Sequence, residues 1–404
     1  MNEKIQRARD VALGILKPDA RDLEHGLELH ANALVCDAYG FAPRAAWDGD
    51  AMRVAIEAGT SEADLKDLEE EMSMTRCVTD AGERAEFQEA WEASGVTCIF
   101  QNAGEESQAP LRIIKRLASF TYVGDMLREF LVRATVPDDI VAARRQNRRC
   151  FYTSRNGVPL AQDWVSVEEE MGFIRVFFQL GVRMMHLTYN RRNMIGDGCA
   201  EPANAGLSDF GRAVVKEMNR AGVIVDVAHA GWQTSLEAAQ ASERPMVASH
   251  SGCCAVNRHI RCKPDEVIRA IADTGGYVGI CSIPAFLGRS GDIQAMLDHV
   301  DYVARTFGVD HVAIGTDTAY VSRNEAAERK KVPARRRVRS RWEGFWPPDA
   351  FGAQWRQESM TLSLAWTNWP LFTVGLVQRG YTDEDIQKIL GGNALRVARA
   401  VWTE

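Results

Sequence analysis

Short apolar runs rich in valine and isoleucine alternate along this chain with longer amphipathic stretches, and this alternation limits the folds open to it. Eight such runs lie at residues 33–39, 96–101, 150–153, 182–188, 223–229, 245–250, 277–282 and 311–317. Runs of this length are typical of buried parallel strands, and the stretches between them are long enough for crossover helices. The pattern predicts an α/β protein with a (β/α)8 TIM-type barrel.

The amphipathic stretches carry signals for where helices begin and end. Between residues 206 and 222, Ser208 or Asp209 can cap the start of a helix, and Gly222 can end it after Arg220. We expect a single barrel domain over residues 1–404, with a helical N-terminal extension at 1–32 and a long insertion at 320–360. This insertion follows the eighth strand, so we expect it over the barrel mouth.

Composition excludes several classes of protein. A net charge of −7 gives no global attraction to nucleic acid or to acidic membranes. No segment approaches the roughly 20 apolar residues of a membrane span, and the amino terminus lacks a signal-peptide core, so we expect a cytoplasmic protein acting on a small molecule. Nine cysteines without a CxxC pair indicate free thiols. The basic run at 329–341 is interpreted as a solvated or ion-paired loop.

Three of the predicted strands end in residues that can carry chemistry. DVAH closes the fifth run at His229, ASH closes the sixth at His250, and AIGTD closes the eighth at Asp317. In barrels of this kind the carboxyl ends of the strands surround one mouth, where catalysis takes place. Histidine exchanges protons near neutral pH and a neighbouring carboxylate can fix its tautomer, so these side chains form a candidate acid–base centre.

Further motifs follow one another along the chain. They are QN at 101–102, LGVRMMHLTYN from 180, GLSDFGRAVVKEMNRAGVIVDVAH from 206, ASHS from 248, RCKPDEV from 261, HVAIGTD from 311 and RGYTDEDIQKILGGNALRV from 379. In this order and spacing they resemble the renal (membrane) dipeptidase family of metal-dependent amidohydrolase barrels. The resemblance implies a homodimer and two zinc ions. The implied ligands are a His-x-Asp after strand one, a bridging Glu after strand three and two histidines after strands five and six, with an Asp after strand eight.

Several positions depart from the implied pattern. DAYGF places Tyr39 and Phe41 where the resemblance implies the metal-binding His and Asp, and residues 153–155 (Thr, Ser, Arg) lie where the bridging Glu is implied. LTYN places Tyr189 where the family has a histidine beside the substrate. Zinc needs nitrogen, sulfur or carboxylate donors, which Phe lacks and neutral Tyr supplies poorly. We therefore expect no bound cofactor, with one zinc ion on the two remaining histidines as the alternative.

The remaining positions define the candidate site. His229 and His250 match the implied histidines and would hold that single zinc, Asp317 matches the implied aspartate, and Arg261 matches an arginine that grips a substrate carboxylate. The candidate catalytic residues are His229, His250, Asp317, Tyr189 and Tyr39, the tyrosines donating to a developing oxyanion. The candidate substrate-binding residues are Arg261, Trp346, Trp342 and Arg155.

Structural alternatives stay open for these residues. The two histidines could be relics that hydrogen-bond in a filled cavity, Arg261 could pair with Asp265, and the tyrosines could only pack. The tryptophans of the insertion could form a packing or dimer contact instead of a substrate wall. His186 lies inside a predicted strand and is expected to be a core histidine, and Cys253 and Cys254 are expected to pack.

Three functions are compatible with these residues. The first is a metal-independent lyase that uses acid–base residues on a small carboxylate or aromatic substrate. The alternative is a zinc-dependent dipeptidase or amidohydrolase with an altered mononuclear site. A catalytically silent binding protein is the third, and nucleic acid and membranes are expected to be partners of none of them.

Overall fold

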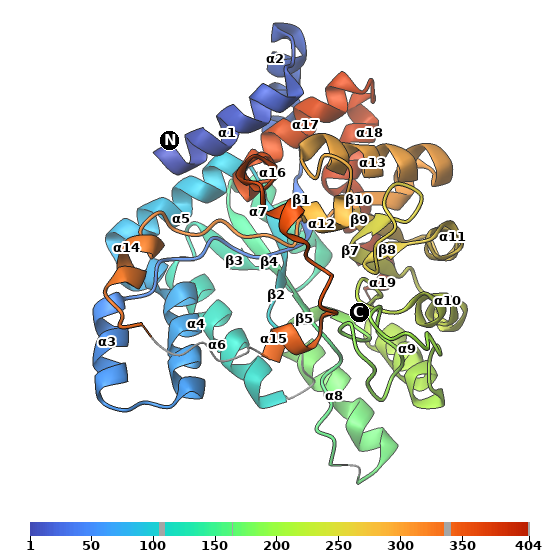
Figure 1. Ribbon diagram of the computed structural model, residues 1–404. Helices are drawn as coiled ribbons and strands as arrows, with labels where there is room; N and C mark the ends of the chain where they lie inside the picture. Colours follow the sequence, from blue (N-terminus) through green and yellow to red (C-terminus); the bar gives the residue numbers. More distant parts are fainter. Residues whose placement is uncertain (105–109, 164, 335–340, 403–404) are drawn as a thin grey trace.

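The computed structural model describes residues 1–104, 110–163, 165–334 and 341–402, and strands rolled into a barrel lie at its centre (Figure 1). The neighbouring parallel strands run in the order β1, β2, β4, β5, β6, β7, β9 and β10. Their bounds are Cys36–Gly40, Cys98–Asn102, Arg149–Arg155, Val182–His186, Ile224–Asp226, Val247–Cys253, Tyr277–Ile280 and Val312–Ile314. Each coincides with one of the eight predicted runs, so the (β/α)8 prediction is confirmed.

Two very short strands were not predicted. β3 (Leu131–Arg133) pairs with β4, and β8 (Cys262–Lys263) pairs with β7. Segments of three and two residues are too short to show a periodic pattern, so only the neighbouring ladder reveals them.

The barrel closes between β1 and the segment after β10. The amide of Asp317 donates to the carbonyl of Tyr39 at 3.0 Å, and Asp37 accepts from the amide and the hydroxyl of Thr316 at 2.9 and 2.6 Å. Trp366 Nε1 donates to the same carboxylate at 3.0 Å. Burial nevertheless raises the pKa of Asp37 to about 7, since these hydrogen bonds offset only part of the desolvation.

Helices surround the strands (Figure 1). Between β1 and β10 they are α3 (Gly49–Glu57), α4 (Glu62–Thr79), α5 (Ala81–Ser94), α6 (Pro110–Met126), α7 (Pro137–Arg145), α8 (Val167–Gln179), α9 (Asp209–Ala221), α10 (Trp232–Ala241), α11 (Asp265–Asp273), α12 (Pro284–Leu287) and α13 (Ile293–Phe307), followed by the 3₁₀ turn η1 (Val309–His311). The predicted caps of α9 are confirmed: Ser208 accepts from the amide of Gly211, and Gly222 ends the helix with a φ of 79°.

The two ends of the chain pack on the barrel as helices. The N-terminal segment forms α1 (Glu3–Leu16) and α2 (Ala20–Asn32), and α17 (Trp369–Gln378) packs against α2. The other elements after β10 are α14 (Glu325–Lys330), α15 (Arg341–Gly344), η2 (Ala353–Arg356), α16 (Glu358–Ser363), η3 (Trp366–Asn368), α18 (Asp383–Gln387), η4 (Lys388–Gly392) and α19 (Asn393–Val401). Among the described helices none is long and apolar enough to cross a membrane.

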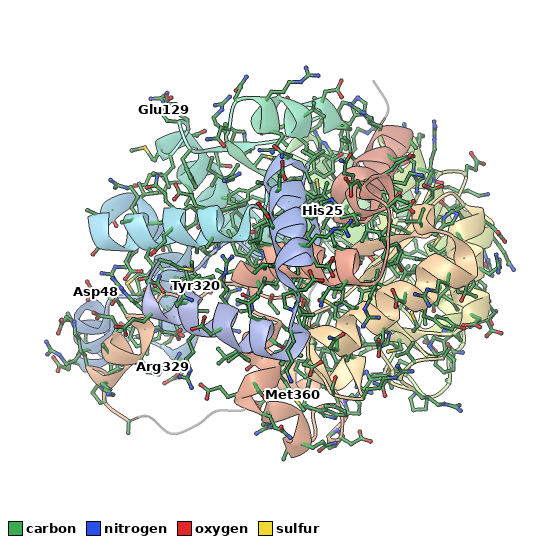
Figure 2. The ribbon with its side chains drawn as sticks, turned by 90° about the horizontal axis from the view of Figure 1, so that it is seen from above. His25, Asp48, Glu129, Tyr320, Arg329 and Met360 are labelled. Atoms are coloured by element: carbon green, nitrogen blue, oxygen red, sulfur yellow. The ribbon has the colours of Figure 1, made fainter. Side chains whose placement is uncertain are left out.

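The start of the insertion lies against the first βα loop. Figure 2 shows Asp48 and Arg329 at the same edge of the molecule, and the Arg329 guanidinium lies 5.7 Å from the ring centroid of Trp47. Lys331 pairs with Asp50 at 3.0 Å, so the first part of the basic run is ion-paired as expected. Residues 335–340 of that run lie outside the described residues.

The barrel interior is filled by small and sulfur-containing side chains as well as rings. All nine cysteines are free, and seven of them are buried, among them Cys36, Cys98 and Cys150 on three neighbouring strands. Cys253 is also buried, as its packing role predicts. At the mouth the strands approach closely: a methyl group on Gly279 would meet the carbonyl oxygen of Ser249 at 1.9 Å. Glycine is therefore required there for the strand carrying His250 to fit.

Candidate active site

His229 and His250 are hydrogen-bonded to each other in the barrel mouth. Their Nε2 atoms lie 2.9 Å apart, His229 Nδ1 lies 2.7 Å from Asn190 Oδ1, and His250 Nδ1 lies 2.8 Å from Ser249 Oγ. An amide oxygen can only accept, so His229 carries its proton on Nδ1. His250 then donates from Nε2, and the Ser249 hydroxyl donates to His250 Nδ1. The four groups form one continuous chain of hydrogen bonds.

Both imidazoles of this pair are neutral at neutral pH. The two side chains are at most 2% exposed. Burial, followed by the positive charge of Arg261, lowers the pKa of His229 and of His250 well below 6.5. Protonation of both would also turn the two Nε2 atoms into donors and break their hydrogen bond. The geometry therefore suits transfer of one proton between the two imidazoles and disfavours a state in which both are charged.

A tyrosine ring covers each histidine. Tyr39 stacks on His250 with ring centroids 3.8 Å apart and planes 12° apart, and Tyr189 stacks on His229 at 4.0 Å and 24°. The Tyr39 hydroxyl donates to Asn156 Oδ1 at 2.7 Å. Both tyrosines predicted as site residues therefore contact the predicted histidines, and each one fixes the plane of its imidazole.

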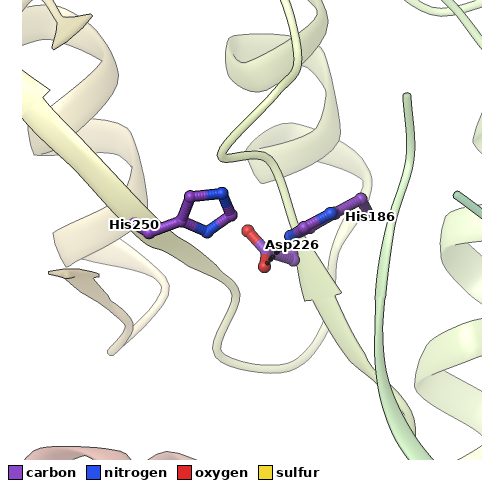
Figure 3. Close-up of side chains that lie close together, drawn as sticks. All are labelled: His186, Asp226 and His250. Carbon is purple, nitrogen blue, oxygen red and sulfur yellow. Dashed lines mark ion pairs between the residues drawn. The ribbon is translucent and has the colours of Figure 1, made fainter. Parts of the chain in front are cut away.

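A second histidine and carboxylate lie beside this pair and were missed at the level of sequence. His186 ends β5 and Asp226 ends β6, and they are partners in the ladder that joins the two strands. His186 Nε2 lies 2.6 Å from Asp226 Oδ2. Figure 3 shows the Asp226 carboxylate between the rings of His186 and His250. Burial by itself would raise the pKa of Asp226, but attraction to His186 and hydrogen bonds from Ser249 hold it below its usual value.

The expectation that His186 is a core histidine was right about burial, since the side chain is 1% exposed, but it overlooked the carboxylate beside it. The sequence does contain a signal for the pairing of His186 with Asp226. Asp226 opens the DVAH motif that ends at His229, and His186 lies near the end of the preceding predicted run. Adjacent parallel strands bring such residues side by side at one end of a barrel.

A cavity of about 330 Å³ opens above the histidine pair. Seven of its fifteen lining residues are aromatic, and six carry polar or charged groups. The lining residues are Tyr39, Phe41, Arg44, Asn102, Gly104, Arg116, Asn156, Tyr189, His229, Ile283, Phe286, Asp317, Trp342, Trp346 and Phe351. This size and character match a site for a small molecule.

The insertion supplies the aromatic roof of this cavity. Trp342 Nε1 donates to the Tyr189 hydroxyl at 3.1 Å, and Trp346 stacks on Phe286 with ring centroids 5.8 Å apart. Trp346 is 8% exposed, whereas Trp342 is 38% exposed. The two predicted tryptophans therefore lie in the cavity wall, where Trp346 is buried and Trp342 is partly exposed to solvent.

Asp317 reaches the cavity from the loop after β10. Its backbone lies in the left-handed region, with a φ of 55°. A residue other than glycine costs about 1–3 kcal/mol in such a conformation, and these conformations gather at functional sites. The Nδ1 atoms of the histidine pair face Asn190 and Ser249, and the Asp226 carboxylate contacts the neighbouring His186 Nε2.

Arg261 and Arg155 lie behind the cavity wall. Both are fully buried, and neither is among the residues that line the cavity. Arg261 Nη2 donates to the carbonyl of His250 at 2.8 Å, and its guanidinium lies over the ring of Phe286. Arg155 Nη2 donates to the carbonyl of Asn156 at 3.0 Å, and burial, then the charge of Arg116, lowers the pKa of Arg155 to about 9.

The two-zinc centre that the family resemblance implies does not fit these residues. The Tyr39 hydroxyl is bonded to an amide oxygen, and Phe41 meets the Tyr39 ring edge-on at 5.9 Å and offers no donor atom. Where a bridging carboxylate is implied, β4 carries residues 153–155, and the Ser154 hydroxyl donates to the backbone of Phe100 at 3.1 Å.

The strand-end residues His229, His250 and Asp317 lie where the active sites of TIM-type barrel enzymes are found. The chain belongs to the membrane dipeptidase family (peptidase family M19), whose profile matches residues 61–327. It is similar to dipeptidase tcpJ of Claviceps purpurea (28% identity over 233 residues, 56% of this chain and 47% of that protein) and to dipeptidase verJ of Clonostachys rogersoniana (30% over 233 residues, 57% and 51%). The chain spans about half the length of these curated relatives.

Solved structures show the same fold. An amidohydrolase from Pseudomonas aeruginosa is 25% identical, with a TM-score of 0.69 over 94% of this chain and 99% of that chain. A metallopeptidase from Rhodobacter sphaeroides, bound to a phosphinate mimic of the dipeptide L-Ala-D-Ala, is 15% identical, with a TM-score of 0.64 over 92% and 99%. The second likeness supports the fold alone.

Proposed function

We propose that this protein is a hydrolase that cleaves a small amide of dipeptide size, bearing a carboxylate and an apolar or aromatic group. One observation carries the proposal: the neutral pair of His229 and His250 lies beneath an aromatic cavity on a membrane dipeptidase barrel. The named relatives are dipeptidases, which favours hydrolysis over the lyase chemistry expected first.

In this proposal Asp317 and His229 share the proton transfers, because both line the cavity. Asp317 accepts a proton from the attacking water, which is the role of a general base. The leaving nitrogen then takes this proton back from Asp317 by way of His229 Nε2, so the amine departs neutral and both groups return to their starting states. The hydroxyls of Tyr39 and Tyr189 stabilise negative charge on the carbonyl oxygen.

Arg261 is proposed to attract the substrate carboxylate. Its Nε and Nη1 are buried and have no hydrogen-bond partner among the described residues. A buried guanidinium with unused donors favours a nearby anion, and Phe286 between it and the cavity sets how closely that anion approaches. Arg44 and Arg116 in the cavity wall add positive charge.

The test is a panel of dipeptides incubated with the purified full-length chain, with release of free amino acids followed by chromatography. Dipeptides with an aromatic side chain should be cleaved faster than Gly-Gly, since the cavity wall is aromatic. Asp317→Asn should lower kcat by about 100-fold or more, in the range of a lost general base. Asp125→Asn, at an exposed position on α6, is the matched control and should not change it.

A metal-independent lyase is the second candidate, and a specific observation favours it. The direct hydrogen bond between the two Nε2 atoms is an acid–base pair that needs no metal, and tyrosines cover both rings. Release of an unsaturated or carbonyl product from a hydroxy or amino acid, without amide cleavage of any dipeptide, would replace the hydrolase proposal with this one.

The cytoplasmic location and the homodimer stay proposals drawn from the sequence and its family resemblance. Light scattering of the purified chain tests the second. A mass of twice 44.9 kDa is the expected result, and a monomer at micromolar concentration would contradict it.

A further inference from the structure

We propose that His186, Asp226 and His250 form a binding site for one divalent transition-metal ion, Zn²⁺ foremost. This ligand set differs from the pair of His229 and His250 expected from the sequence, and the site would lie below the cavity, whose lining includes His229 but none of the three. The inference does not rest on the proposed hydrolysis, because metal binding is measured without substrate.

The three side chains come from three neighbouring parallel strands. His186 ends β5, Asp226 ends β6, and His250 lies in β7. One donor atom from each residue lies within 4.8 Å of the other two. Donors around a tetrahedral ion at 2.0–2.1 Å lie about 3.4 Å apart, so shifts of about 1 Å would bring them into coordination.

Unused hydrogen-bonding capacity points to a ligand at this position. His186 Nε2 and Asp226 Oδ2 approach to 2.6 Å, yet the contact lacks hydrogen-bond geometry, and both ring nitrogens of His186 lack a directed partner. The other carboxylate oxygen, Oδ1, accepts from the amides of Ala228 and Ser249 at 2.9 and 3.1 Å. His186 Nε2 and Asp226 Oδ2 are thus held by their mutual ion-pair contact, and a shared cation between them would satisfy both residues.

His250 can become a ligand without losing its outer contact. If the ion takes His250 Nε2, the ring proton moves to Nδ1, where the Ser249 hydroxyl can turn and accept it. The hydrogen bond to His229 would then open, which leaves His229 facing the cavity. Two imidazoles and one carboxylate with a free position are a donor set of catalytic zinc sites, where the ion acts as a Lewis acid.

The experiment titrates Zn²⁺ into chelator-stripped full-length protein against a chromophoric competitor. Wild type should bind one ion per chain. His186→Ala and Asp226→Asn should lose at least about 100-fold in affinity, more than the loss of a supporting hydrogen bond costs. Asn keeps the oxygen that accepts from Ala228 and Ser249, so Asp226→Asn is the variant chosen to preserve the fold.

Two control variants separate this site from its alternatives. His229→Ala should bind within about tenfold of wild type if the three residues are the ligands. His25→Ala, on the outer face of α2 (Figure 2), tests adventitious binding to a surface histidine and should bind as wild type does. Loss of binding in His229→Ala together with retention in His186→Ala would overturn the proposal, as would a wild type that binds no ion.

Crystals of the wild type soaked in Zn²⁺ give a readout that does not depend on variant folding. An anomalous difference peak at coordination distance, about 2.0–2.2 Å, from the Asp226 carboxylate supports the site. A peak contacting only His229 and His250, or no peak in the barrel, overturns it.

Discussion

Lys263 offers a direct test of how the buried polar groups hold the site together. The side chain is fully buried beneath the loop that carries His229. Its Nζ donates to the carbonyls of Val227 and Ala230 at 2.7 and 2.8 Å, on either side of that histidine, and to Ser235 Oγ at 3.3 Å. The perturbation is Lys263→Met, which keeps an unbranched side chain one atom shorter and removes all three hydrogen bonds.

The loss of stability depends on which of the three oxygen atoms keep another hydrogen bond once Nζ is removed. Val227 O still accepts from the amide of Ala230 at 3.0 Å, and Ser235 Oγ still donates to Gly231 O at 2.8 Å. Ala230 O loses its donor, and a buried acceptor without a partner costs about 1–3 kcal/mol. The variant also loses the hydrogen bonds of a charged group, but it no longer has to bury an ammonium, and we expect these two contributions to cancel. The unpaired Ala230 carbonyl then remains, so Lys263→Met should lower the free energy of unfolding by about 2 kcal/mol at pH 7.

The dependence on pH has a definite sign. Burial lowers the pKa of Lys263 from 10.5 to about 8. Between these two values the unfolded chain binds a proton that the folded chain has lost, so the stability of the wild type rises with pH. Met does not titrate. The difference in free energy of unfolding between wild type and Lys263→Met should therefore widen by about 2 kcal/mol from pH 7 to pH 9.5. Each pH unit above the folded pKa contributes about 1.36 kcal/mol.

Urea unfolding followed by circular dichroism at both pH values measures this gap. Taking the difference between the proteins removes the titration of the buried thiols, which both share. Lys66→Met, at an exposed position on α4, is the control and should stay within about 0.5 kcal/mol of the wild type at either pH. A gap that stays constant or narrows as the pH rises would refute the reasoning.

Three further outcomes are expected. Gly279→Ala should cost more than about 3 kcal/mol or prevent folding, because its methyl group would meet the Ser249 carbonyl at 1.9 Å; near-native thermal melting would contradict this. Gly14→Ala, in α1 with no atom within 4 Å of the new methyl group, should stabilise the protein by about 0.5–1 kcal/mol in the same assay. Stability should fall as the pH drops below 6.5, because the unfolded chain protonates His229 and His250 while burial keeps the folded pair neutral, and double Gln replacement should flatten this dependence.

The barrel was predictable because the signals for it are local. The six residues of the apolar run 277–282 are enough to predict a strand. A single residue at each end, Ser208 and Gly222, is enough to mark where α9 begins and ends. The same locality places His250 and Asp317 at one end of the barrel, because parallel strands share the direction of their carboxyl ends. The short strands β3 and β8 were missed, since two or three residues carry no period.

What the sequence by itself determined is therefore the barrel, and the mouth to which the strand-end residues belong. Only the tertiary structure decided which of them meet. Asp226 lies beside His186 and not at the cavity, His229 and His250 bond to each other beneath two tyrosines, and Arg261 lies behind Phe286. The physical reason is that strand register, side-chain rotamer and burial act between residues far apart in the chain, and no local pattern encodes them.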